Sequence, residues 1–168
     1  AKSPEVIFLP QYAQGGGLQV RQARELGINA TILGSNSLSD QNFIDACGGI
    51  KNASGTFFLF NVNFSDPKFE RFHRAYEARY GEPVATYHTV FGYDDIYIIA
   101  RAISSVGKPD PIAIRDALEN LKNVPILAGD GSFTMNPKTH QPVNMPSWVF
   151  RWGEDGSRIP VKLSYPAE

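Results

Sequence analysis

The sequence predicts an α/β fold built on a mainly parallel sheet, because three apolar segments alternate with two helical ones in the first third of the chain. The apolar segments are EVIFLP, ATILGS and GTFFLFNVNF, which cover residues 5–10, 30–35 and 55–64. Short, continuous apolar runs of this kind are typical of strands buried on both faces of a parallel sheet. The resulting β-α-β-α-β order predicts right-handed crossovers between neighbouring parallel strands.

The two connecting helices are predicted from apolar spacing and from end signals. In residues 17–27 an apolar face is followed by Gly27, a typical stop residue; the face consists of Leu18, Val20, Ala23 and Leu26. In residues 37–48 Ser37 and Asp40 form an S-x-x-D capping pattern. Both helices are therefore expected to lie between consecutive strands.

The middle of the chain predicts three helices with no clear strand between them. They cover residues 67–81, 89–107 and 111–121, and Asp66-Pro67 and Asp110-Pro111 supply N-cap and first-turn signals. The first carries a stripe of rings, namely Phe69, Phe72, Tyr76 and Tyr80. The second is largely apolar, so it is expected to be buried on more than one side.

The last part of the chain predicts β-structure. Asn136-Pro137 is a turn signal, and SWVFRWGEDGSRIPVKL, residues 147–163, predicts two strands around the turn GEDG.

Composition excludes several functional classes. The 168 residues carry a net charge of -1 and no long Lys/Arg run, so no nucleic-acid partner is expected. The longest apolar stretches fall well short of the roughly 18 residues of a membrane span. Cys47 is the single cysteine, which excludes an internal disulfide framework and a cysteine-based zinc site.

Three consecutive glycines, residues 15–17, raise the question of phosphate binding. Gly15 and Gly17 fit the start of a dinucleotide fingerprint, but its third glycine position is Val20, and no Gly-Lys-Ser/Thr follows. Two readings stay open. In the first, the stretch is a flexible loop entering a helix. In the second, Gln11 and Tyr12 at the strand end face a cleft and the glycines let another surface approach, since ligands of open α/β sheets bind at the carboxyl ends of the strands.

No catalytic or metal-binding constellation is predicted. The histidines 73, 88 and 140 are scattered without metal-ligand spacing, and no G-x-S-x-G elbow is present. Asp94 and Asp95 are adjacent on a helix, where they point in different directions, so a solvated or hydrogen-bonded helix face is expected. We expect no enzyme activity and no cofactor.

Three motifs carry a resemblance to a known family. RQARELGI, F-x-x-x-Y-x-x-R-Y-G (residues 72–81) and GYDDIY (residues 92–97), in this order, resemble the C-terminal half of type I periplasmic binding proteins of the leucine/isoleucine/valine ABC importer type. The resemblance implies a three-layer α/β/α, two-lobe fold of which this chain is an incomplete fragment. It implies that residues 1–61 belong to the second lobe, that residues 62–145 belong to the first, and that residues 146–168 return a strand to the second.

The resemblance also implies a set of ligand-binding residues. Tyr12 matches the strand-end tyrosine that flanks the ligand, and Asn36 matches an acidic residue that pairs with the ligand ammonium. We expect ligand contacts from Tyr12, Asn36 and His88, with Gln11, Ser35 and Tyr87 nearby. Because an amide offers no net charge to a buried ammonium, Asn36 favours a ligand without one, such as an aromatic or other organic acid or a small amide.

The function that follows from the resemblance is that of a non-enzymatic, extracytoplasmic (periplasmic) solute-binding component of an ABC importer. It would bind a small amino acid or organic acid between two lobes and deliver it to a permease. The alternative is a ligand-sensing domain of a receptor or regulator with the same fold. Exposed sheet edges and helix faces in a fragment further predict a dimer or a domain swap.

Overall fold

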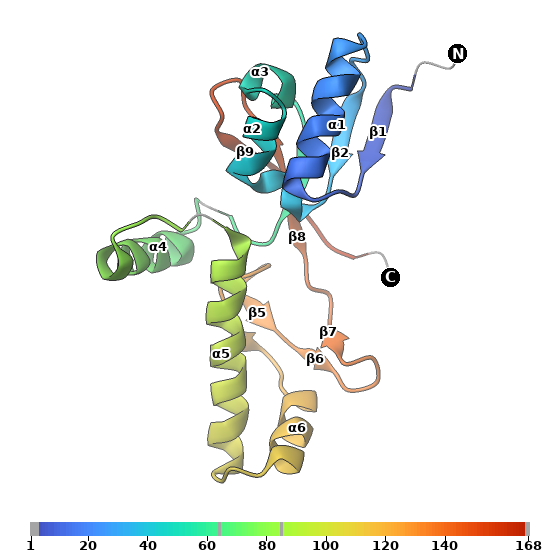
Figure 1. Ribbon diagram of the computed structural model, residues 1–168. Helices are drawn as coiled ribbons and strands as arrows, with labels where there is room; N and C mark the ends of the chain where they lie inside the picture. Colours follow the sequence, from blue (N-terminus) through green and yellow to red (C-terminus); the bar gives the residue numbers. More distant parts are fainter. Residues whose placement is uncertain (1–3, 64, 85, 167–168) are drawn as a thin grey trace. The chain divides into compact units, whose positions relative to one another are not determined.

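The computed structural model describes residues 4–63, 65–84 and 86–166, and the chain forms two compact units. Unit 1 contains the residues up to Asn61 together with Ser147–Ser164, and unit 2 contains Val62–Pro146 together with Tyr165 and Pro166. Figure 1 shows the elements of each unit.

Unit 1 is built on a five-stranded sheet of order β1-β2-β3-β8-β9. Its strands are β1 (Val6–Leu9), β2 (Thr31–Gly34), β3 (Phe57–Phe60), β8 (Ser147–Trp152) and β9 (Arg158–Ser164). The pairs β1–β2 and β2–β3 are parallel, which confirms the β-α-β-α-β prediction. β8 pairs antiparallel with β3, and β9 pairs antiparallel with β8, so the hairpin predicted around GEDG is also confirmed.

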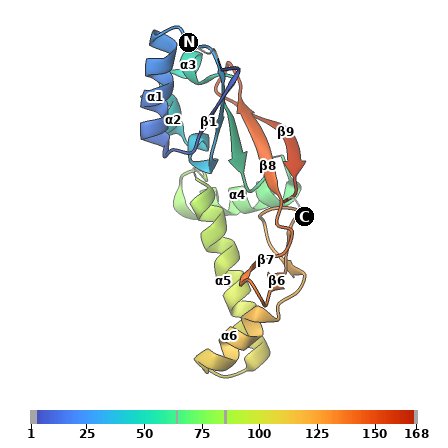
Figure 2. The same cartoon turned by 90° about the vertical axis from the view of Figure 1, so that its right-hand side faces the viewer.

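Helices cover one face of this sheet, as Figure 2 shows. They are α1 (Ala13–Glu25), the 3-10 turn η1 (Asn36–Ser39), α2 (Gln41–Ala46) and α3 (Ile50–Ala53). Beneath them Phe58 contacts the rings of Phe150 and Trp152, with centroids 5.9 and 5.1 Å apart. The alternate residues Phe8 and Leu33 remain exposed, so among the described residues of unit 1 the apolar core lies on the helical face alone. The expected burial of these strands on both faces of the sheet is therefore wrong.

The predicted capping pattern of the second helix is wrong in its first member. Ser37 lies inside η1, and α2 begins after Asp40, whose carboxylate accepts from the backbone N–H of Asn42 at 2.9 Å. The chain therefore makes a separate tight turn before α2 begins, which the S-x-x-D spacing does not reveal.

Two of the three consecutive glycines, Gly16 and Gly17, serve close packing inside unit 1. α1 already begins at Ala13, so the glycines lie in its first turns, and Gly16 and Gly17 are buried. A Cβ on Gly17 would lie 2.6 Å from both the Cβ of Ala46 and the carbonyl oxygen of Phe43, and one on Gly16 would lie 2.8 Å from Leu38. The absence of side chains lets α1 approach α2 and η1, so the flexible-loop reading is wrong.

The described residues of unit 2 form three helices and short strand pairs. They are α4 (Pro67–Tyr80), α5 (Tyr87–Val106), α6 (Pro111–Glu119), β4 (Val124–Pro125), β5 (Ser132–Phe133), β6 (Met135–Asn136) and β7 (Gln141–Pro142). As predicted, Asp66 and Asp110 cap α4 and α6 ahead of a first-turn proline. The predicted ring stripe of α4 is confirmed as well, since consecutive rings from Phe69 to Tyr80 lie 4.6–6.3 Å apart.

The core of unit 2 lies between α5 and the segment around β4 and β5. Val124, Ile126, Ala128 and Phe133 are buried, and Phe91 of α5 packs against them. Asp94 of α5 is also buried and accepts from the backbone N–H groups of this segment. The predicted hydrogen-bonded role of this carboxylate is therefore confirmed.

The prediction that the second middle helix is buried on more than one side is wrong for the described residues. Ile96, Tyr97, Ile99 and Ile103 of α5 are 65, 55, 42 and 44% exposed. Within the described parts of unit 2, α6 and the β4–β5 segment pack against the other side of α5 and leave this face open.

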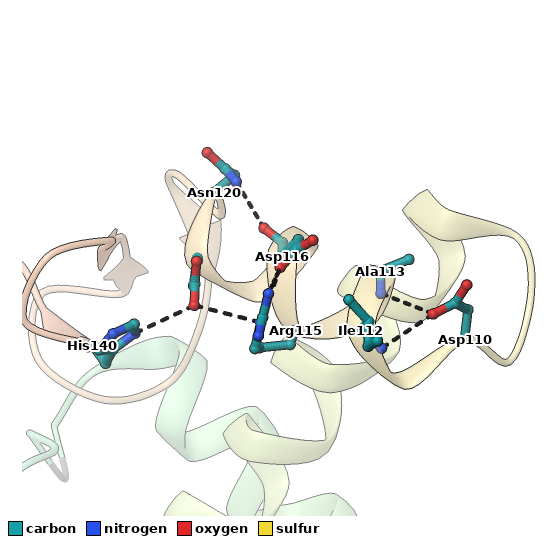
Figure 3. A network of polar contacts seen from close by, with 8 residues as sticks. Asp110, Ile112, Ala113, Arg115, Asp116, Asn120 and His140 are labelled. Carbon is teal, nitrogen blue, oxygen red and sulfur yellow. Dashed lines mark hydrogen bonds and ion pairs between the residues drawn. The ribbon is translucent and has the colours of Figure 1, made fainter.

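A surface network ties α6 to the β6–β7 turn, as Figure 3 shows. Arg115 contacts the carboxylate of Asp116 and lies 3.8 Å from Glu119, which in turn lies 3.5 Å from Nδ1 of His140. All four side chains are at least partly exposed, so the network is a solvated polar cluster of small energetic value.

Candidate functional site

The predicted ligand residues of unit 1 gather at one edge of its sheet. β1 and β2 are parallel and in register, with Leu9 opposite Gly34, so both strands end at the same edge. Gln11 and Tyr12 follow β1, and Ser35 and Asn36 follow β2. This is the carboxyl-terminal edge, where open α/β sheets bind ligands.

A hydrogen bond joins the two strand-end loops. The hydroxyl of Ser35 donates to the carbonyl oxygen of Gln11 at 3.1 Å. Gly34 permits the tight turn that follows β2, because a Cβ there would lie 2.1 Å from Cδ1 of Leu38. The loop after β2 therefore folds back against its own strand end and is tied to the loop after β1.

Two polar side chains at this edge have hydrogen-bonding capacity to spare. Tyr12 is 83% exposed and precedes α1 in an extended backbone conformation. Asn36 is half-buried at the start of η1. Within residues 4–63, 65–84 and 86–166, neither the Tyr12 hydroxyl nor the Asn36 amide makes a hydrogen bond. Both groups can therefore serve a small polar ligand.

Two residues that the sequence did not single out hold the Asn36 loop from behind. The indole N–H of Trp152 donates to the carbonyl oxygen of Leu38 at 2.8 Å. Arg158 donates from Nε and Nη2 to the carbonyl oxygen of Ser39 at 3.1 and 2.9 Å. The hairpin prediction placed Trp152 and Arg158 near each other, but no local signal connects them to a loop more than 110 residues earlier.

The remaining predicted residues, Tyr87 and His88, belong to unit 2. They open α5, and their ring centroids lie 4.0 Å apart. His88 is exposed and Tyr87 half-buried. The structure thus brings together Gln11, Ser35 and their loop neighbours in one unit, and Tyr87 with His88 in the other.

Other reactive side chains do not form a site. Burial raises the pKa of the Cys47 thiol to about 11, so this buried cysteine is a neutral thiol at physiological pH. In the described ranges no three His, Cys, Asp or Glu residues cluster with metal-binding geometry. No helix in that part of the chain combines the length and hydrophobicity needed to cross a bilayer.

Two hollows lie along α4 and α5 within unit 2. They have volumes of about 460 and 470 Å³ and share a floor of cationic and aromatic side chains, namely Lys68, Arg71 and Tyr93, with Leu127. None of the predicted ligand residues lines them. Tyr97 of the open face of α5 lines one of them.

Comparison with known proteins identifies relatives over nearly the whole chain. The family model described as "Periplasmic binding protein" matches residues 1–157. A leucine-, isoleucine-, valine-, threonine- and alanine-binding protein of Pseudomonas aeruginosa is 24% identical over 159 residues, which is 94% of this chain and 41% of that protein.

Solved structures show the same fold. A leucine-binding protein of Thermotoga maritima matches with a TM-score of 0.82 and 22% identity, over 97% of this chain and 45% of that one. A branched-chain amino acid transporter substrate-binding protein of Streptococcus pneumoniae, in complex with isoleucine, also gives 0.82 and 22%, over 96% and 45%. The chain thus spans less than half the length of these relatives.

Proposed function

Because the chain belongs to the Periplasmic binding protein family, we propose that it is the ligand-binding part of an extracytoplasmic solute-binding component of an ABC importer. Its relatives are named as amino-acid-binding proteins, so the proposed role is non-enzymatic. The proposed ligand is a small amino acid or organic acid, and the proposed partner is the importer's permease.

The observation that carries the proposal is the polar edge of the unit 1 sheet. Ser35 and Gln11 tie two strand-end loops together, and the loops offer the phenol of Tyr12 and the amide of Asn36. A binding protein needs such groups to be rigidly held before the ligand arrives, because ordering them on binding would cost affinity. The hydrogen bond between the two loops supports this requirement, because it holds the loops in place without a ligand.

The chemistry of this edge favours a ligand without an ammonium group. Asn36 offers a dipole but no charge, and the nearest acidic residue of its loop, Asp40, already caps α2 through Asn42. A desolvated ammonium requires a charged partner or a strong set of acceptors. An organic acid or small amide could instead accept from the Asn36 amide and the Tyr12 hydroxyl.

The proposed mechanism is closure of two lobes on the ligand, with unit 1 as the second lobe and unit 2 as part of the first. Closure is a population shift, in which the ligand stabilises the state that contacts it from both lobes. Tyr87 and His88 are the proposed contributors from unit 2.

A thermal-shift panel on the complete product of the gene that encodes these 168 residues tests the proposal. The panel compares L-leucine and L-valine with benzoate and small amides, since a ligand that binds the folded state raises apparent stability by mass action. Tyr12→Ala and Asn36→Ala should abolish the shift. Asn42→Ala, an exposed asparagine of α2, is the matched control.

Stabilisation only by compounds without an ammonium supports the ligand class, and stabilisation by leucine or valine contradicts it. If the shift survives both Tyr12→Ala and Asn36→Ala, the site is elsewhere. Turnover of any panel compound would argue for an enzyme. Genes for a permease and an ATPase beside the coding sequence would favour import over sensing.

A further inference from the structure

The loop that carries Asn36 ends in two buried carbonyl groups. Leu38 and Ser39 close the η1 turn and are 0 and 2% exposed. Carbonyl oxygens at the end of a short helical turn lack intrahelical partners, and a buried one must find a partner elsewhere. The side chains that donate hydrogen bonds to these carbonyl oxygens therefore determine the position of the loop.

Both partners come from the β8–β9 hairpin. Trp152, the last residue of β8, is 1% exposed and donates its indole N–H to Leu38 at 2.8 Å. Arg158, the first residue of β9, donates twice to Ser39. Consecutive carbonyls of one loop are therefore held by two side chains of one hairpin.

The two donors also hold each other. Trp152 and Arg158 are opposite partners in the strand register, and the guanidinium carbon lies 5.1 Å from the indole ring centroid. This distance is within the range of a cation–π interaction. Burial lowers the pKa of Arg158, while the negative charge of Asp40 raises it. The guanidinium thus contacts the Trp152 ring and the Ser39 carbonyl oxygen, and it interacts electrostatically with the Asp40 carboxylate.

Asn36 lies between this anchor and a second one. On its N-terminal side Ser35 is bonded to Gln11, and on its C-terminal side Leu38 and Ser39 are bonded to the hairpin. With both flanks fixed, the direction of the Asn36 side chain depends on where the hairpin places the η1 turn.

We propose that Trp152 and Arg158 are positioning residues that set the orientation of Asn36 at the ligand edge without touching the ligand, an inference that rests on the proposed function. Trp152→Phe keeps the aromatic ring but removes the N–H donor. Arg158→Lys keeps the charge but cannot reproduce the paired Nε and Nη2 donation. Arg151→Lys is the matched control, because Arg151 adjoins Trp152 in β8 and its side chain makes no hydrogen bond with the described residues.

The first readout is the side-chain amide signal of Asn36 in ¹⁵N–¹H spectra of the 168-residue chain. Both variants should shift this signal while the spectrum stays that of a folded protein, and Arg151→Lys should leave it in place. An unchanged Asn36 signal in folded Trp152→Phe and Arg158→Lys overturns the positioning role. If Trp152→Phe does not fold, the milder Arg158→Lys decides alone.

The second readout is the affinity of the complete gene product for benzoate and for L-leucine. Each variant should weaken binding of whichever probe binds by roughly tenfold, which is the scale of one lost hydrogen bond. In a protein that already carries Asn36→Ala, Trp152→Phe or Arg158→Lys should reduce the affinity little further, because their effect on binding acts through Asn36. Fully additive losses overturn the inference. If Asn36→Ala itself leaves the affinity unchanged, the proposed ligand site is wrong. An Asn36 amide signal that does not move in Trp152→Phe and Arg158→Lys is a separate result, which overturns only the positioning role.

Discussion

Asp94 accepts a hydrogen bond from the backbone N–H of Ala128 at 2.9 Å, across 34 residues of sequence. Its other carboxylate oxygen accepts from Leu127 at 2.8 Å. One buried carboxylate thus satisfies two consecutive backbone donors and joins α5 to the segment that carries the unit 2 core.

Asp94→Asn should destabilise unit 2. The substituted amide keeps one acceptor oxygen but turns an NH₂ group toward a backbone N–H, so one buried donor loses its partner, at a cost of about 1–3 kcal/mol. Urea unfolding of the 168-residue chain measures the loss. Asp95→Asn, at the neighbouring exposed position, is the control and should be near neutral. Equal effects of the two substitutions would show that the paired acceptance by Asp94 contributes little.

The stability supplied by Asp94 should depend on pH. Burial raises the pKa of this carboxyl above its ordinary 3.8, against the opposing effect of the two backbone hydrogen bonds. The folded state therefore holds the proton more tightly than the unfolded state. The proton-linked part of the contribution is fully present below pH 3.8 and is lost as pH rises through the higher folded pKa, while the two hydrogen bonds to the carboxylate remain.

The measurement compares wild type with Asp94→Asn by urea unfolding from about pH 3 to about pH 7. The difference in the free energy of unfolding should fall with rising pH in the lower part of this range and be level above it. A difference that grows with pH there would mean that the hydrogen bonds outweigh burial and that the folded pKa is depressed.

Gly17→Ala should destabilise unit 1 even though alanine favours a helix. The added methyl would lie 2.6 Å from Ala46 and from the Phe43 carbonyl, so α1 and α2 must separate. Overpacking of this kind costs about 1–3 kcal/mol, which exceeds the gain of about 1 kcal/mol in helix propensity. Thermal unfolding of Gly17→Ala and Gly15→Ala tests this. Gly15 has only an ordinary 3.5 Å contact, so its variant should be neutral or more stable.

Features that local chemistry dictates were predictable from sequence. Gly81 ends α4 with φ 75°, and Asp66 and Asp110 cap helices through their own neighbours. The strand-end position of Tyr12 followed from the apolar run before it. In each case the interacting groups lie within a few residues, so their spacing carries the information.

Features that depend on distant partners were not predictable in the same way. The glycines of α1 have a packing role that becomes clear only when α2 lies against them, as Gly17 does against Ala46. The Trp152–Leu38 bond joins positions 114 residues apart. Exposed helix faces were expected of a fragment in general, but the sequence did not assign one to α5. An apolar helix sequence shows how much surface the helix can bury, and it does not show which elements are present to cover that surface.

Asn36→Asp should change the preference of the proposed site. The substitution is nearly isosteric and supplies the charge that the amide lacks, so amino acids should bind more tightly and organic anions more weakly. Titration calorimetry of the complete gene product with L-leucine and benzoate measures both. The proposed contact between Asn36 and the ligand predicts opposite changes for the two probes. Parallel changes would indicate a general effect on the fold.

The open face of α5 should make the 168-residue chain self-associate. Ile96, Ile99 and Ile103 recur at helical spacing on one side of α5 and are 65, 42 and 44% exposed. Burying one such side chain fully contributes about 1.5–3 kcal/mol, so several together favour a dimer or a swapped pair. Ile96→Glu should reduce the mass measured by light scattering toward that of a monomer. Ile112→Glu on α6, where the isoleucine is 67% exposed, matches the change in charge and exposure away from this face and should have no effect. A monodisperse monomer for the unmodified chain would contradict the prediction, and a dimer that survives Ile96→Glu would assign the interface to another surface.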